Sequence, residues 1–252
     1  MGKDKSFWYH VVSKLRKEKS KMKKYELTNE YIVNSKIKLF RIKALVSFGN
    51  VEAGEFGGYI EKEENLSHEG NAWVYDNACV YGNARVYDDA GIYGNAHVYG
   101  NAVIYENAHV YGNAVIYGNV CVYGDAEVYG NARVYGDAEV YGNAEVYDNA
   151  EVYDNAEIYG DAWVCGNEHV HGDALIEKAT HVFQIGAIGS RNGFTTFFRN
   201  KKNKILVTCE CFFGDIDTFE KKVKSTHART KHEKTYMLAI ELAKAQIELD
   251  EE

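Results

Sequence analysis

Two histidines and a glutamate between residues 151 and 171 are the side chains whose types and spacing could bind a metal ion. His169 and His171 are two residues apart, so in an extended strand they point to the same side. Glu151 precedes His169 by eighteen residues, a multiple of the six-residue repeat described below. Two imidazoles and a carboxylate are ligands that Zn²⁺ accepts. Glu168 also interrupts the repeat here, which favours ordinary substitution over ligation. We therefore predict no metal site and no cofactor, with these three residues as the only candidates.

Two further groups could carry chemistry near the C-terminus. Gly189-Ser190-Arg191-Asn192-Gly193 could hold an anion on its backbone amides and its arginine, but a short glycine-rich turn before a strand is also a common hairpin connection. Cys209 and Cys211 alternate within the apolar stretch 204–213, predicted as one strand with both thiols on one side. Without a second cysteine pair, we expect these thiols in the core.

A repeat of six residues must position most of the other side chains. Residues 71–178 form eighteen hexads of the form Asn/Asp-Ala-x-Val/Ile-Tyr-Gly without an insertion or deletion. A fixed short period indicates a solenoid, in which each repeat contacts mainly its neighbours. Strand alternation puts positions two and four inside, and the variable position three and the tyrosine outside. Glycine accepts positive φ freely, and Asn or Asp tolerates it, so we assign the Gly-Asn pair to the corners.

The hexad resembles the hexapeptide-repeat superfamily, whose motif is an aliphatic residue followed four positions later by a small one, as in Val74 to Ala78. The resemblance implies a mainly β fold, a left-handed parallel β-helix with three hexads per coil and about six coils. It also implies one candidate activity, because enzymes of this superfamily are typically trimeric acyltransferases that use an interface histidine. The outward histidines are His97, His109, His169 and His171, and none stands out by context. The uninterrupted hexads also leave no loop to hold a substrate.

Residues eighteen apart stack on one face of such a solenoid, so the tyrosines form three columns that we expect to be exposed. Exposed aromatic arrays are enriched at binding interfaces. We predict a homodimer or trimer, with the self-contact at the residues Val103, Cys121, Tyr105 and Tyr123. We predict contact with another protein at the residues Tyr129, Tyr147, Glu127, Glu139, Glu145, Glu151, Glu157 and Trp163.

Charge and composition narrow the partner class. The chain of 252 residues has a formal net charge of −8, and residues 71–178 alone contain seventeen acidic and three basic residues. This surface disfavours direct binding to nucleic acid, because phosphate backbones attract lysine and arginine. There is no long apolar run that would span a membrane. Five cysteines without framework spacing predict free thiols in a reducing compartment, and we expect a cytoplasmic protein.

The ends of the solenoid require caps, because they expose unpaired backbone and a bare core. Residues 25–70 are predicted as an N-terminal cap that begins with a hairpin and ends in an irregular first coil. Its segment 56–70 resembles the entry segment of hexapeptide proteins common in bacteriophages and prophages, a group with no established general activity. Residues 179–252 are predicted as an α+β domain, with helices over 215–224 and 230–249. Asp217 is the expected N-cap of the first helix, and Tyr236, Ala239, Ile240, Leu242 and Ala243 are the expected buried positions of the second.

Residues 1–24 are basic and form a separate leader, either helical or disordered. Phe7, Val11 and Leu15 would lie on one helix face, which could dock on a membrane or partner. Alternatively, Met22 is the natural start and the first twenty-one residues are not native.

These observations favour a protein-binding scaffold without catalysis over the acyltransferase. An acidic aromatic rod fits a basic partner surface, such as that of a protein that handles nucleic acid. Given the resemblance to phage proteins, we expect a phage-encoded inhibitor of a host defence protein, for example a CRISPR effector.

Overall fold

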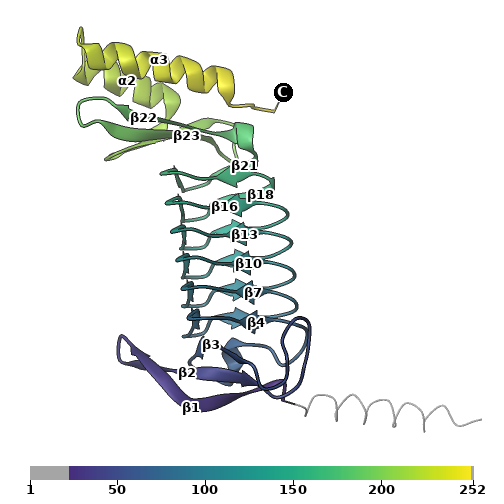
Figure 1. The fold of residues 1–252 in the computed structure, drawn as a ribbon. Helices are drawn as coiled ribbons and strands as arrows, with labels where there is room; N and C mark the ends of the chain where they lie inside the picture. The colour runs from purple at the N-terminus through teal and green to yellow at the C-terminus, as the bar shows by residue number, and fades with distance from the viewer. Residues whose placement is uncertain (1–22, 251–252) are drawn as a thin grey trace, which may run out of the picture.

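The computed structural model describes residues 23–250 and shows a three-sided parallel β-solenoid with a hairpin below it and a helix-covered sheet above it (Figure 1). The predicted leader lies outside the described residues, except for Lys23 and Lys24. Lys24 belongs to the cap rather than to the leader: it is buried, and its Nζ donates to the carbonyl of Ala72 at 2.8 Å. The cap therefore includes Lys24, one residue before the predicted boundary.

Each hexad contributes one short strand, and strands eighteen residues apart pair in parallel register. The three resulting faces are named by their first and last solenoid strands. The β4–β19 face contains β4 (Trp73–Val74), β7 (Gly91–Ile92), β10 (His109–Val110), β13 (Glu127–Val128), β16 (Glu145–Val146) and β19 (Trp163–Val164). The β5–β20 face contains β5 (Cys79–Val80), β8 (His97–Val98), β11 (Val115–Ile116), β14 (Arg133–Val134), β17 (Glu151–Val152) and β20 (His169–Val170). The β6–β21 face contains β6 (Arg85–Val86), β9 (Val103–Ile104), β12 (Cys121–Val122), β15 (Glu139–Val140), β18 (Glu157–Asp161) and β21 (Leu175–Lys178).

The interior follows the alternation predicted from the sequence. Every Val or Ile at position four and every Ala at position two has no exposed surface. Val120 is equally buried at position two, and Glu168 is 8% exposed there. The aliphatic side chains thus form one continuous core along the rod, which is the main stabilising contribution to this part of the fold.

At each corner only one residue of the Gly-Asn pair adopts positive φ, contrary to the prediction that both adopt or tolerate it. Positive φ falls on position six, which is Gly in most corners and Asp or Glu in the others, such as Asp76 at 51° and Glu106 at 58°. The Asn at position one instead forms amide ladders: the Nδ2 of Asn77 donates to Oδ1 of Asn95 at 3.3 Å, and Asn95 donates in turn to Asn113 at 3.2 Å. Such ladders satisfy the amide groups and fix the register between coils.

The N-terminal cap adds a further coil below the predicted six, giving about seven turns. The hairpin of β1 (Tyr25–Asn34) and β2 (Ile37–Ala44) is as expected, and β2 pairs with β3 (Phe56–Ile60). β3 then pairs in parallel with β5 and extends the β5–β20 face, and a bridge from Leu66 to Val86 extends the β6–β21 face. The short 3-10 helix η1 (Glu63–Asn65) lies between them. Gly57 and Gly58 permit this close approach, because a Cβ at either would lie 2.5–2.6 Å from a carbonyl oxygen of the first regular coil.

The C-terminal unit is an antiparallel sheet covered by two helices on the side away from the solenoid (Figure 1). After the 3-10 helix η2 (Ala179–His181), its elements are β22 (Val182–Ile188), β23 (Gly193–Arg199), β24 (Ile205–Cys209), β25 (Phe212–Asp215), α2 (Ile216–Thr226) and α3 (Lys231–Gln246). Side chains of the sheet and both helices form a second core. Val182 and Phe198 join the solenoid core, so the sheet closes the top of the rod.

Four sequence predictions for this unit are wrong in detail. Residues 204–213 form two strands rather than one, because Glu210 adopts positive φ (52°) and the chain turns back. Cys209 is therefore buried while Cys211 is exposed. The N-cap of α2 is Asp215, which accepts a hydrogen bond from the amide of Thr218 at 2.7 Å, and not Asp217. Leu242 was predicted to be buried but lies on the outer side of α3, 53% exposed. Within residues 23–250, no helix is long and apolar enough to cross a membrane.

Candidate protein-binding surface

The β4–β19 face combines stacked tyrosines, carboxylates and a tryptophan on one flat side of the rod. The rings of Tyr111, Tyr129 and Tyr147 are nearly parallel, with centroids 4.7 and 4.9 Å apart. Beside them, Glu127, Glu145 and Trp163 stand in register in three successive coils. The side chain of Trp163 ends this column at the top of the rod and is 52% exposed.

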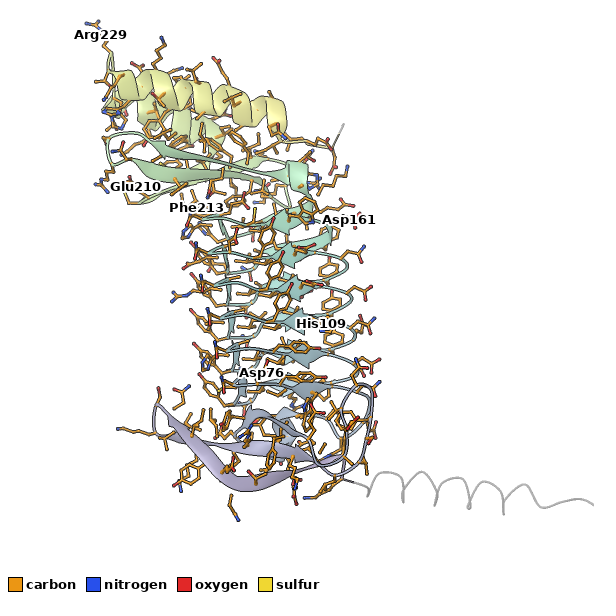
Figure 2. All side chains as sticks on the ribbon, in the orientation of Figure 1. Asp76, His109, Asp161, Glu210, Phe213 and Arg229 are labelled. Atoms are coloured by element: carbon orange, nitrogen blue, oxygen red, sulfur yellow. The ribbon has the colours of Figure 1, made fainter. Side chains whose placement is uncertain are left out.

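All fifteen ladder tyrosines are partly buried rather than exposed as predicted. For most of them the reason is stacking, since their rings cover much of the faces of neighbours in adjacent coils. On the β5–β20 face the stack runs without a break from Tyr81 to Tyr153 and ends on His171, with centroid separations of 4.4 to 5.2 Å. Phe213 of β25 then packs on His171 at 4.1 Å, at the junction visible in Figure 2.

The tyrosine hydroxyls of the β4–β19 face are bound to the carboxylates of the next coil. The hydroxyl of Tyr111 donates to Oε2 of Glu127 at 2.6 Å, and that of Tyr129 donates to Oε2 of Glu145 at 2.7 Å. Burial, together with these carboxylates, raises the pKa of both phenols well above the ordinary value. At Tyr147, a hydrogen bond with Cys165 and burial raise the pKa to about 12. The phenols therefore remain neutral donors at physiological pH, and their hydrogen bonds fix the orientation of the glutamates.

Tyr129→Phe is expected to lower the free energy of unfolding by about 1 kcal/mol, because it removes a hydrogen bond to a charged group. The matched control is Tyr99→Phe, which removes a hydroxyl from an equally stacked ring that faces Val115 instead of a glutamate in the next coil. Urea unfolding monitored by circular dichroism measures both. Equal losses in the two variants would show that the Tyr129–Glu145 bond contributes nothing specific.

The other glutamates predicted to contact a partner lie on the remaining two faces and differ in their pairing. Glu139 and Glu157 are on the β6–β21 face, and Glu151 is on the β5–β20 face. Glu157 forms an ion pair with Lys201 at 2.5 Å, and Glu151 lies 3.7 Å from both Arg133 and His169. The eight predicted residues therefore do not form one patch. Only Tyr129, Tyr147, Glu127, Glu145 and Trp163 share a face.

The residues predicted for self-contact do lie together. Val103 and Cys121 are direct partners in the register of the β6–β21 face, and the rings of Tyr105 and Tyr123 stack beside them at 4.9 Å. All four are half-buried. Self-contact through this surface stays a prediction.

The three candidate metal ligands do not share one set of contacts, because Glu151 and His169 face each other and His171 contacts other residues. His169 Nδ1 faces Glu151, whereas His171 is buried, with Nδ1 3.5 Å from Asp154 and Nε2 2.8 Å from the hydroxyl of Thr208. Burial lowers the pKa of His171. No group of three potential metal ligands occurs in the described part of the chain. The arrangement explains His171 as the ring that ends a tyrosine stack rather than as a ligand.

The candidate anion loop is the turn between β22 and β23. Gly189 (φ 77°) and Asn192 (φ 52°) make the turn, and Arg191 pairs with Glu210 at 3.0 Å. A Cβ at Gly189 would overlap the hydroxyl of Tyr236, which explains the glycine by packing. With the arginine already neutralised by Glu210, the loop presents no net positive charge for an anion.

Of the outward histidines considered for acyl transfer, His97 in β8 and His109 in β10 occupy different faces. The Nδ1 atom of each is buried without a hydrogen-bond partner in the described structure. Burial lowers the pKa of His97, which favours the neutral imidazole that a general base requires. Figure 2 shows His109 midway along a rod whose coils carry no inserted loop.

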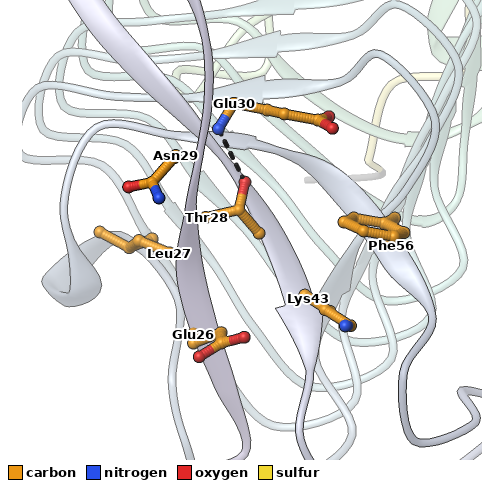
Figure 3. A pocket seen from close by; sticks show the side chains of 7 residues that line it. All are labelled: Glu26, Leu27, Thr28, Asn29, Glu30, Lys43 and Phe56. Atoms are coloured by element: carbon orange, nitrogen blue, oxygen red, sulfur yellow. Dashed lines mark hydrogen bonds between the residues drawn. The ribbon is translucent and has the colours of Figure 1, made fainter.

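A hollow in the N-terminal cap was not expected from the sequence. It lies between β1, β2 and the start of β3, and its volume is about 490 Å³ (Figure 3). A bulge in β1 between Leu27 and Tyr31 creates it, and the amide of Glu30 donates to the hydroxyl of Thr28 at 3.2 Å within the bulge. Lys43 and Phe56 line the opposite side. The hollow is open, and its polar lining residues are Glu26, Thr28, Asn29, Glu30 and Lys43.

The solenoid geometry and the uninterrupted hexads define a hexapeptide-repeat type of β-solenoid. The family model described as the YdcK beta solenoid repeat matches residues 78–94, 90–106 and 126–142, all within the rod. The chain is also similar to the uncharacterized acetyltransferase YdcK of Escherichia coli strain K12, with 36% identity over 67 residues. That match covers 23% of this chain and 21% of the relative, so the chain spans about a fifth of the relative's length. The handedness of the coils and a phage origin stay predictions from the resemblance.

Proposed function

We propose that the protein is a non-catalytic binding scaffold that contacts a basic protein surface with its β4–β19 face. The observation that carries the proposal is the pair Glu127 and Glu145, aligned in adjacent coils beside three stacked tyrosines. Neither glutamate forms an ion pair with a cation of residues 23–250.

Two aligned carboxylates repel each other, because parallel strands are only about 4.8 Å apart. The phenol hydrogen bonds hold both carboxylates in place without neutralising them. A lysine or arginine of a partner would relieve the repulsion and form charge-assisted hydrogen bonds. The adjacent rings and Trp163 supply apolar surface of the kind enriched in the centre of interfaces, so charge and apolar contact occur together on this face.

A partner that handles nucleic acid fits this surface best, because such proteins expose lysine and arginine for phosphate groups. The acidic rod would occupy the surface that otherwise attracts a polyanion. A host defence nuclease, such as a CRISPR effector, is one member of this class. That finer assignment rests only on the predicted phage origin.

Acetyl transfer is the second candidate, because the similar YdcK protein of Escherichia coli is named an acetyltransferase. The buried, unpartnered nitrogens of His97 and His109 are the features that favour it. Against it, the pocket-forming loops that such a reaction needs are not inserted between the coils, so a substrate would have to bind between subunits.

The test begins with affinity capture from the source cell and continues with calorimetric titration of the purified partner against the purified protein. The charge-reversing double variant Glu127→Lys/Glu145→Lys is expected to weaken binding about 100-fold, because it replaces two attractive contacts with repulsive ones. The matched control is Glu26→Lys/Glu69→Lys, which changes the net charge equally at exposed cap residues. We expect the control to alter affinity less than threefold.

Equal weakening by both double variants would contradict the proposal, since the effect would then depend on net charge alone. Turnover of acetyl-CoA that is lost in His97→Ala or His109→Ala would also contradict it, in favour of the enzyme. Acetyl transfer is measured on the same wild-type preparation, so one protein sample decides between the two functions.

A further inference from the structure

Helix α3 is apolar on two opposite sides. Tyr236, Ala239, Ile240 and Ala243 are buried against the sheet and α2. On the other side, Leu238 is 51% exposed and Leu242 is 53% exposed. These two leucines are one turn apart, so they form a short stripe on the outermost surface of the helix. Exposed leucines at helical spacing are typical of a helix face that packs against another helix.

Two charged residues flank this stripe on the same side. At 100° per residue, Lys234 and Glu241 lie about 40° and 60° from Leu238 in the same direction. Both are exposed, and neither forms an ion pair within residues 23–250. By contrast, Lys244 of the same helix pairs with Glu220 of α2 at 3.3 Å. Two unpaired charges of α3, one of each sign, therefore stand beside the leucines.

The spacing of these charges is self-complementary. Lys234 lies about 6 Å before Leu238 along the helix, and Glu241 lies about 4.5 Å after it. Two antiparallel copies of α3 can be related by a two-fold axis that passes between them at the level of Leu238, perpendicular to the helices. This rotation reverses the direction of the helix and leaves Lys234 and Glu241 on the same edge of the contact. Each Lys234 then stands opposite the partner's Glu241, the two Leu238 side chains meet at the axis, and each Leu242 lies about 6 Å from the axis along the helix. Such an isologous arrangement is the usual form of a homodimer contact.

We propose that α3 is a homodimer contact, in which two copies of this chain meet end to end through Leu238 and Leu242 with two symmetric Lys234–Glu241 ion pairs. The place of α3 at the far end of the molecule permits this contact (Figure 1). A single pair of helices buries little area, so the dimer is weak and depends on concentration. The contact lies apart from the β4–β19 face and does not require the proposed function.

Sedimentation of the full chain between about 5 and 200 μM measures the self-association. Leu238→Lys places two like charges at the two-fold axis, and we expect it to be monomeric over this range. Leu45→Lys is the matched control, because Leu45 is also exposed (43%) but lies in the N-terminal cap. We expect the control to dimerise as the wild type does, and thermal unfolding of both variants checks that each is folded.

A charge exchange distinguishes self-pairing from any other occupant of the stripe. Lys234→Glu and Glu241→Lys are each expected to weaken the dimer about tenfold, and the double variant Lys234→Glu/Glu241→Lys is expected to restore it. Binding of a different protein to the stripe would not be restored by the double variant. A wild type that stays monomeric at 200 μM, a double variant as weak as the single ones, or a dimer lost in Cys121→Arg but kept in Leu238→Lys would each overturn the proposal. The last result would place the contact on the β6–β21 face.

Discussion

Glu168→Gln is expected to raise the free energy of unfolding by about 3 kcal/mol at pH 8 and to change it little at pH 4. Glu168 occupies a position-two site, which is filled by alanine in nearly every other hexad, and it is 8% exposed. Its Oε2 accepts one hydrogen bond, from the amide of Cys165 at 2.9 Å. Burial raises its pKa from 4.5 to about 7.

The direction of the pH dependence follows from which state, folded or unfolded, loses the Glu168 proton first as the pH rises. Below about pH 4.5, the carboxyl is protonated in both the folded and the unfolded protein, so it contributes no pH dependence. Between pH 4.5 and 7, the unfolded chain ionises while the folded protein does not, and stability falls as the pH rises. Above about pH 7 the loss is complete, at roughly 1.4 kcal/mol for each pH unit of difference between the two pKa values. Glutamine keeps the acceptor for Cys165 and has no charge to bury.

Urea unfolding at pH 4, 6 and 8 measures this difference. The control is Glu69→Gln, which removes the same charge from an exposed residue and is not expected to stabilise the protein at pH 8. If Glu168→Gln had the same stability relative to wild type at all three pH values, burial of this carboxyl would not be the cause of the pH dependence.

Gly118→Ala is expected to lower the free energy of unfolding by about 3 kcal/mol. Alanine disfavours the backbone conformation at this position, and its methyl group has no space there. Gly118 has a φ of 92°, and a Cβ built on it would lie 2.6 Å from the carbonyl oxygen of Gly136 and 2.9 Å from its amide nitrogen. Both atoms are backbone of the next coil, so they cannot move without spreading the parallel strands.

Gly166→Ala separates the two causes. Its φ is also positive (64°), but the nearest atom to its Cβ is Oε1 of Gln184 at 3.7 Å, in ordinary contact. We expect a loss of about 1 kcal/mol from backbone strain alone. Thermal unfolding of both variants gives the comparison. A loss in Gly118→Ala no larger than that in Gly166→Ala would show that the coils can separate at little cost.

The interior of the rod was predictable because it depends on local alternation. In each hexad the position of the valine or isoleucine fixes which residues face inward, and the structure confirms this from Val74 to Ile176. The surface was harder to predict, because it depends on contacts between coils. The sequence places tyrosine outside, but only the spacing of coils determines that neighbouring rings stack and remove one another from solvent.

The columns of the candidate surface were predictable, but three of the eight residues predicted to contact a partner lie on other faces, and the pairing of the glutamates was not predictable. Columns of residues eighteen apart placed Glu127, Glu145 and Trp163 on one face. The ion pair of Glu157 with Lys201 joins residues from the solenoid and the C-terminal unit, and no repeat predicts such a contact. Leu242 was misjudged for a related reason: helical periodicity identifies apolar stripes but does not say which of two stripes meets the core.

Because the hexads are uninterrupted, insertions and deletions affect the core and the surface differently. The core tolerates changes of six residues, whereas the surface columns tolerate only changes of eighteen. An insertion or deletion of six residues keeps every aliphatic side chain inside, because the corner pattern is unchanged. It also moves every later residue to the next side of the rod, so that a change between Glu127 and Glu145 would place them on different faces. Only a change of eighteen residues preserves both the interior and the columns. Duplication or loss of single hexads in the gene would therefore yield proteins that fold equally well and present different surfaces, whereas whole-coil changes would lengthen or shorten the same surface.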